Sequence, residues 1–144
     1  MPTARNFFNE QQQQLLIAAI AEAEMNTSGE IRLHLENFCL GSELKAAERI
    51  FRRLKMHETK ERNAILIYVA TLSRKVAVVG DEGIHKKLGA AYWDKMVSDL
   101  ITQFKLDKKA EALSAAIIDC GKQLGTYFPR QADDKDELSN SISF

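Results

Sequence analysis

The sequence has little cysteine, little proline and no net charge, and each shortage excludes a class of protein. Its 144 residues include two cysteines and two prolines. Cys39 and Cys120 lie far apart without a CxxC spacing, so neither a disulfide framework nor a cysteine metal site is expected. Lys plus Arg number 20 and Asp plus Glu number 20. This balance removes the general attraction to nucleic acid or to an anionic membrane.

A long apolar run and the common enzyme signatures are also missing. No stretch approaches the roughly 18 to 20 apolar residues of a membrane span, and the N-terminus has no signal-peptide pattern. The motifs HExxH, GxxxxGK[ST], GxSxG and GxGxxG are absent. We therefore expect a cytoplasmic monomer that binds neither membrane nor nucleic acid.

Length and hydrophobic periodicity predict one folded domain of helices and strands. Apolar residues at helical spacing predict four helices, with a brief turn at 84–88, and Asn9, Ser42 and Asp107 are the predicted N-caps. The helices are expected at 10–25, 42–56, 91–104 and 107–128. Strands are expected at 30–36, 64–70 and 75–79.

The strand patterns also predict how the sheet is connected. Residues 30–36 alternate between apolar and polar, as in a half-exposed strand, whereas the continuous apolar run 64–70 indicates a central strand. The short turn 71–74 predicts an antiparallel hairpin with 75–79. A helix between the first two strands predicts a right-handed parallel crossover. The expected fold class is therefore α/β with a small mixed sheet.

This topology brings three loops to one edge of the sheet. The start of each parallel strand lies beside the end of the antiparallel strand, so loops 27–30, 62–63 and 80–83 should meet. Asp81 and Glu82 would then lie near Glu30. Crowded carboxylates repel unless a cation or proton joins them, and hard oxygen ligands suit Ca²⁺ or Mg²⁺. The sequence therefore predicts a divalent-cation site at this edge.

Acidic residues at 133–137 form a second candidate element. Asp133 and Asp134 could fold back over the same edge and close the cation site. The alternative is a solvated acidic segment, because the spacing does not match the EF-hand pattern. We assign residues 1–138 to the domain and 139–144 to a flexible tail.

Three further features are open to two interpretations each. A basic cluster at Arg49, Arg52, Arg53 and Lys55 could contact nucleic acid, but is simpler as a solvated helix face. Cys120 is simplest as a small core residue rather than a reactive thiol. Among the histidines, His85 alone falls near the proposed edge, where a surface role is simpler than catalysis.

Several segments, in this order, resemble the TPM domain family. The family includes a thylakoid-lumen protein linked to photosystem II repair and many bacterial proteins, and the resemblance covers about residues 7–138. The matching segments are Thr27-Ser28-Gly29-Glu30-Ile31-Arg32, Arg62-Asn63 with the strand 64–70, 74–79 with Gly80-Asp81-Glu82-Gly83-Ile84, Phe128-Pro129-Arg130 and Asp133-Asp134.

The resemblance implies a three-layer α/β/α sandwich around a small mixed sheet. It also implies divalent-cation binding by an acidic groove, and a phosphatase activity of the kind proposed for plant members. Extracytoplasmic members usually have a GYG-like turn after the hairpin, where this sequence has Gly80-Asp81-Glu82-Gly83. That departure strengthens an acidic site, and the lack of secretion and membrane segments makes a photosystem role inapplicable.

Three functions follow as hypotheses. The first is a module that binds Ca²⁺ or Mg²⁺ through Glu30, Asp81 and Glu82, with Asp133 and Asp134 closing the site. The second is a metal-dependent phosphatase acting on phosphomonoesters, in which Arg62 neutralises phosphate charge. The third is a non-catalytic domain that contacts another protein.

Overall fold

A computed structural model describes residues 2–131 and 141–144 and contains a three-stranded mixed sheet. Its strands are β1 (Glu30–Glu36), β2 (Ala64–Ala70) and β3 (Lys75–Gly80), in the order β1-β2-β3. β1 pairs with β2 in parallel, and β2 pairs with β3 antiparallel. The predicted parallel crossover and antiparallel hairpin are both confirmed.

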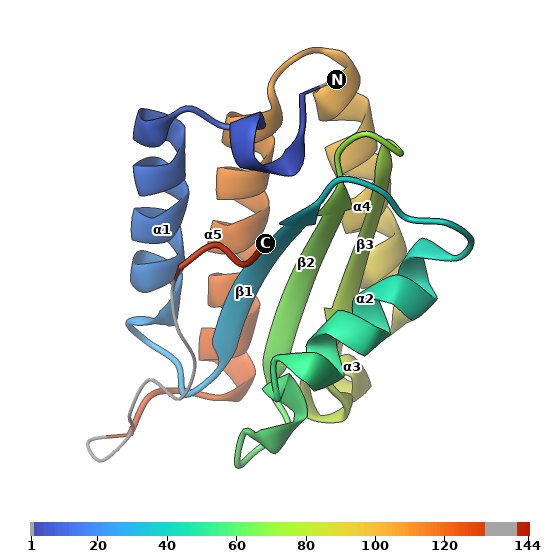
Figure 1. The fold of residues 1–144 in the computed structure, drawn as a ribbon. Helices are drawn as coiled ribbons and strands as arrows, with labels where there is room; N and C mark the ends of the chain where they lie inside the picture. The colour runs from blue at the N-terminus through green and yellow to red at the C-terminus, as the bar shows by residue number, and fades with distance from the viewer. Residues whose placement is uncertain (1, 132–140) are drawn as a thin grey trace.

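Helices cover both faces of this sheet and give the expected three-layer α/β/α sandwich (Figure 1). The first face is covered by α1 (Glu10–Glu24), α4 (Ala90–Lys105) and α5 (Lys109–Tyr127), and the second by α2 (Glu43–Arg53). The short helix α3 (Glu82–Leu88) follows β3, and two 3₁₀ turns are η1 (Ala4–Asn6) and η2 (Met56–Glu58). No helix among the described residues has the length and apolar character needed to cross a membrane.

The sheet separates two apolar cores. Leu33 and Ile67 belong to the larger core, under α1, α4 and α5, while Leu66 and Tyr68 belong to the smaller one, under α2. All seven residues of β2 are buried, so the prediction of a central strand is confirmed. Alternate β2 side chains enter opposite cores, which explains why this strand is apolar throughout.

Local capping follows the sequence prediction at two of three helices. Asn9 forms a capping box with Gln12, and the Ser42 side chain accepts the Lys45 N–H. Asp107 was predicted to cap the last helix, which is wrong: α5 begins at Lys109, and Asp107 has a left-handed backbone (φ 58°) in the turn after α4. The brief turn expected at 84–88 is instead part of α3, which Asp81 caps.

β1 is less exposed than its alternating pattern predicts. His34, on its polar face, is fully buried. The last residues of the chain lie along the outer edge of β1 (Figure 1), where Ser143 donates its N–H to Leu33 O and accepts the Leu35 N–H. Ile142 enters the larger core. Residues 141–144 therefore lie as an extra edge segment on β1. The sequence suggested a flexible tail instead, because backbone pairing to a sheet edge leaves no signature in the pattern of side chains.

The thiol of Cys120 lies in the larger core. Burial raises its pKa to about 12, with a smaller contribution from the charge of Asp119. A thiol with so high a pKa stays protonated at neutral pH and is a poor nucleophile. The structure therefore agrees with a packing role for this cysteine.

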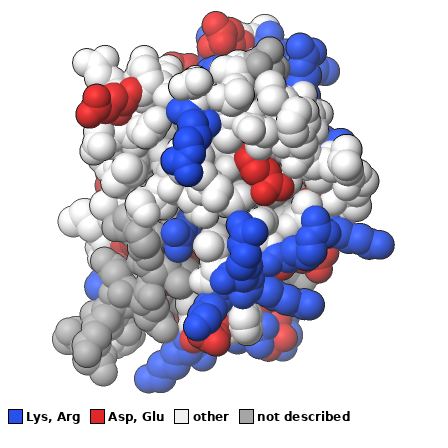
Figure 2. All heavy atoms as spheres, viewed as in Figure 1, with Lys and Arg blue, Asp and Glu red and all other residues white. Residues whose placement is uncertain are grey.

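The helix α2 presents its basic cluster to solvent. Its apolar side, which includes Ala47 and Phe51, is buried, whereas Arg49, Arg52 and Arg53 are exposed. Figure 2 shows Lys and Arg side chains gathered over this helix on one face of the molecule. The cluster thus forms a solvated helix face, with cations near the C-terminal end that the helix dipole favours.

Candidate functional site at the sheet edge

The loops predicted to converge do meet at one edge of the sheet. Glu30, the first residue of β1, is opposite Ala64, the first residue of β2. The end of β3 reaches the same edge, because the Asp81 N–H donates to Ala64 O at 2.9 Å. Glu30, Arg62, Asp81 and Glu82 therefore lie at a single edge, as the topology predicted.

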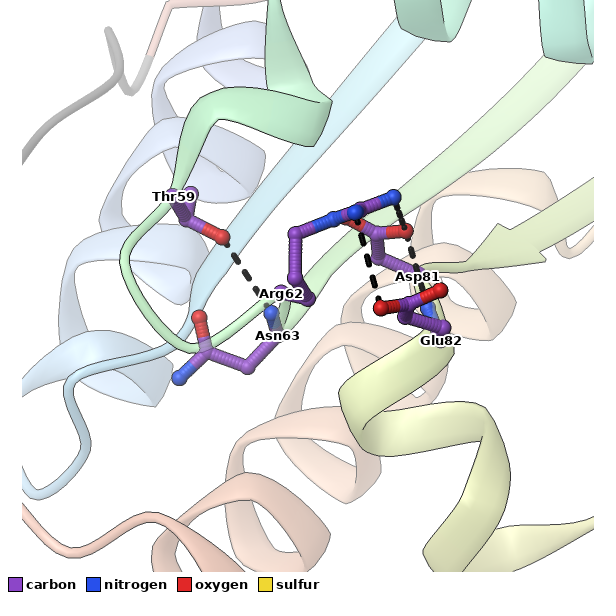
Figure 3. A network of polar contacts seen from close by, with 5 residues as sticks. All are labelled: Thr59, Arg62, Asn63, Asp81 and Glu82. Carbon is purple, nitrogen blue, oxygen red and sulfur yellow. Dashed lines mark hydrogen bonds and ion pairs between the residues drawn. The ribbon is translucent and has the colours of Figure 1, made fainter.

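The charged groups at this edge centre on Arg62 and Asp81 (Figure 3). Arg62 donates from Nε to Asp81 Oδ2 at 2.7 Å and from Nη2 to Asp81 Oδ1 at 2.9 Å. Its Nη1 lies 3.5 Å from Glu82 Oε1. The hydrogen bond to Asp81 is the main cause that raises the pKa of Arg62. The positive charge that these carboxylates require is therefore supplied from within the chain.

Asp81 has a structural role in addition to its ion pair. Its side chain is 7% exposed, and its Oδ1 accepts the Glu82 N–H at 2.8 Å, which caps α3. Glu82 is 60% exposed and Arg62 is 42% exposed. The carboxylate of Asp81 is thus fixed from two sides, whereas Glu82 and the guanidinium remain open to solvent.

The backbone around Arg62 is held in an uncommon conformation that aims its side chain at Asp81. Arg62 has φ 54°, in the left-handed region. Thr59 fixes the loop on both sides, since its carbonyl accepts the Arg62 N–H and its Oγ1 accepts the Asn63 N–H (Figure 3). Gly83 donates its N–H to Arg62 O at 2.8 Å. A Cβ on Gly83 would lie 2.2 Å from Glu61 O, so only glycine permits this approach.

A second polar network joins the loop before β1 to the loop before β2. The Ser28 hydroxyl donates to Glu61 Oε2 at 3.0 Å and accepts from Asn63 Nδ2 at 3.1 Å. The sequence interpretation missed Ser28, Glu61 and Asn63 as contacts. The available signal was their position, inside or next to the loops that the topology brings together.

Of the other predicted ligands, only Glu30 lies among the described residues. Glu30 is at the same edge but is 1% exposed. Asp133 and Asp134 lie outside the described residues. Among the residues that are described, no three His, Cys, Asp or Glu side chains are placed to hold a metal ion. His85 is engaged elsewhere, because its Nδ1 accepts the indole N–H of Trp93 at 2.9 Å.

The different settings of Asp81 and Glu82 predict unequal effects on stability. Asp81→Ala removes both the cap of α3 and the paired contact with Arg62, and should lower the free energy of unfolding by about 1–2 kcal/mol. Glu82→Ala removes only a long, solvated contact and should change it by less than about 0.5 kcal/mol. Urea unfolding of both variants measures the difference. Equal losses would show that the carboxylate of Asp81 contributes no more to the free energy of unfolding than that of Glu82.

Comparisons with known proteins agree with this architecture. A family model described as the TPM domain matches residues 3–123. The BA42 protein of the psychrophilic bacterium Bizionia argentinensis, solved by NMR, is 38% identical, with a TM-score of 0.86 over 95% of this chain and 94% of BA42. The N-terminal domain of a P. gingivalis protein is 15% identical, with a TM-score of 0.71 over 87% of this chain and 82% of that one, a likeness of fold alone. No curated protein matches the chain.

Proposed function

This chain belongs to the TPM domain family, and we propose that it binds a divalent cation, Ca²⁺ or Mg²⁺, at the sheet edge around Asp81. The observation that carries the proposal is the pairing of Asp81 and Glu82 with a single guanidinium. Two carboxylates share one guanidinium, so a negative charge remains at this edge, and carboxylate oxygens suit hard cations. Cation binding is also what the family resemblance implies.

Binding at this position is a competition with Arg62. Asp81 already accepts two hydrogen bonds from the guanidinium and one from the Glu82 N–H. A cation that takes Asp81 as a ligand must displace the guanidinium, which is partly solvated and can turn outward. Asp81 and Glu82 would supply the first ligands. Glu30, Asp133 and Asp134 remain the further ligands that we propose.

Because the cation competes with Arg62 for Asp81, substitutions of these two residues should have opposite effects on cation affinity. Arg62→Gln removes the internal cation and should tighten Ca²⁺ or Mg²⁺ binding by about three- to tenfold. Asp81→Asn removes the ligand charge and should abolish saturable binding. Isothermal titration calorimetry with each cation measures both effects.

A matched arginine serves as control. Arg74 is exposed and has a left-handed backbone (φ 55°), but it lies in the turn at the other end of β3. Arg74→Gln removes the same charge from the chain and should leave cation affinity unchanged. No saturable heat from either the natural chain or Arg62→Gln would overturn the proposal and leave a non-catalytic interaction domain.

Metal-dependent hydrolysis of phosphomonoesters is the second candidate. The observation that favours it is the half-exposed Arg62 guanidinium beside the carboxylates, because a displaced guanidinium could neutralise phosphate charge. A bound divalent cation would supply Lewis-acid polarisation of a phosphoryl oxygen and an activated water. In this function Arg62 binds the phosphate and a carboxylate orients the water.

Arg62→Gln separates the two candidates. In a pure binding module the substitution only tightens cation binding. In a phosphatase it should tighten the cation yet reduce Mg²⁺-dependent hydrolysis of p-nitrophenyl phosphate, since the phosphate loses its guanidinium. Absence of Mg²⁺-dependent turnover in the natural chain would eliminate the second candidate and leave the first intact.

A further inference from the structure

A groove separate from the sheet-edge site lies between β1 and α2. Its volume is about 460 Å³, and its lining residues are Glu36, Ala46, Arg49, Ile50, Arg52 and Arg53. β1 contributes Glu36 to the lining of the groove. Arg32 and His34 do not line it, but they lie on the same face of β1 as Glu36, the face of the sheet that α2 covers only in part. None of its lining residues belongs to the sheet-edge site.

The groove carries a surplus of positive charge. Arg49, Arg52 and Arg53 line it, and none of the three makes an ion pair among the described residues. Its one acidic group is Glu36, and both carboxylate oxygens are in use: Oε1 contacts His34 Nε2, and Oε2 accepts the Tyr68 hydroxyl. Three of the four residues in the basic cluster that the sequence singled out therefore line a groove: Arg49, Arg52 and Arg53.

Arg32 provides a second, independent observation on the same face. Its Nε is buried and has no hydrogen-bond partner within the part of the chain that the structure describes. Buried guanidinium nitrogens are nearly always paired, so this one can take an acceptor from solvent or from a bound anion. Arg32 is two residues before His34 and lies on the same side of β1.

The charges of Arg32 and Arg53 both affect the pKa of His34. Burial is the main cause that lowers the pKa of His34, and contact with Glu36 opposes it. The positive charges of Arg53 and then Arg32 lower it further. Arg53 on α2 and Arg32 on β1 therefore both lie close enough to His34 for their charges to act on it.

We propose that this groove binds a phosphate group, as free phosphate or as a small phosphomonoester, at the guanidiniums of Arg49, Arg52 and Arg53 on α2. Arg32, which shares a face of β1 with Glu36, would be a further donor. Guanidinium forks match phosphate oxygens bidentately, and a dianion neutralises more than one of them. The buried Arg32 nitrogen would gain the acceptor that it lacks.

The size and lining of the groove favour a small anion over a nucleic acid. The cavity is suited to a small molecule, and its lining contains no aromatic side chain on which a nucleobase could stack. The chain has no net positive charge to attract a nucleic acid backbone over a wide area. A compact anion with several oxygens uses the convergent guanidiniums best.

The test uses inorganic phosphate and O-phosphoserine as probes, with binding followed by two-dimensional NMR of the backbone amides. Saturable shifts should be confined to β1 and α2. Arg53→Gln and Arg49→Gln, both exposed positions that leave the fold unchanged, should each weaken binding by about tenfold. Arg74→Gln removes the same charge elsewhere and should leave the affinity as it was.

The imidazole of His34 supplies a readout that does not depend on any activity. Bound phosphate offsets the charges of Arg53 and Arg32, so the pKa of His34 should rise when phosphate is added and should not rise in Arg53→Gln. The tighter of the two probes identifies whether the natural ligand is free or esterified phosphate.

Two results would overturn the proposal. One is the absence of saturable shifts in β1 and α2 with both probes. The other is an equal loss of affinity in Arg74→Gln and Arg53→Gln, which would mean only diffuse attraction between a cation and an anion. Neither result bears on cation binding at Asp81, so the two proposals fail separately.

Discussion

Gly121→Ala is expected to lower the free energy of unfolding by about 1–3 kcal/mol, even though alanine is the better helix former. Gly121 lies in α5, where this helix passes α1 at close range. A Cβ there would be 2.7 Å from Ala23 Cα and 2.8 Å from Ala23 O. These are backbone atoms, so the two helices must move apart, and the tightly packed core between them is disturbed.

Gly125 offers a matched control one turn further along the same helix. A Cβ on Gly125 would meet only Asn26 O, at the ordinary contact distance of 3.5 Å. Gly125→Ala should therefore raise stability by up to about 1 kcal/mol through helix propensity alone. Thermal or urea unfolding compares the two. If both substitutions stabilise the protein, the contact between α1 and α5 is looser than the structure shows.

Acidification should destabilise the protein through His34. The imidazole is fully buried, with Nδ1 at 2.9 Å from Ser143 Oγ and Nε2 at 3.1 Å from Glu36 Oε1. Its pKa is lower in the folded protein than the ordinary value of 6.5, chiefly because of burial. The unfolded chain therefore takes up the proton first as the pH falls. The resulting stability is complete above pH 6.5 and is lost as the pH drops toward the folded pKa.

The loss of stability has an upper limit, because His34 takes up a single proton. The free energy of unfolding can fall by at most about 1.4 kcal/mol per pH unit from this group, or about 2 kcal/mol between pH 6.5 and 5.0. Urea unfolding at both pH values measures it. His34→Gln should flatten the dependence, whereas His57→Gln, at an exposed position, should leave it in place. An unchanged slope in His34→Gln would assign the acid sensitivity to other groups.

The layers of the fold could be predicted from the sequence, because the patterns that indicate them lie within short segments of the chain. The uninterrupted apolar run of β2 can be buried only between two layers, and the short turn before β3 requires an antiparallel partner. These two features, with a helix between β1 and β2, leave one arrangement of strands. Convergence of Glu30, Arg62 and Asp81 at one edge follows from that arrangement without knowledge of any side chain.

Side-chain partners within the site could not be predicted in the same way. The sequence suggested that the carboxylates at the edge would need an added cation, but Arg62 already pairs with Asp81. This pairing depends on the left-handed backbone of Arg62 and on the close approach of Gly83 to the Arg62 carbonyl. Both result from the way α3 meets the loop before β2, which no local pattern encodes.

The same limit explains β1 and the end of the chain. An alternating strand predicts one solvated face, yet His34 and Glu30 are buried. His34 stacks on Tyr68 and contacts Ser143, whose backbone pairs with the edge of β1. The sequence pattern of residues 141–144 does not predict pairing with a strand. Their position is set by unpaired backbone groups on β1, to which almost any extended segment can bond.

By itself, the order of apolar and polar residues determined the strands, their directions and the edge where the loops meet, since burial requirements act residue by residue along the chain. Only the tertiary structure decided which charges pair and which remain available. Pairing depends on ångström-scale distances between segments remote in sequence. These distances pair Arg62 with Asp81 and leave Arg49, Arg52 and Arg53 along the groove.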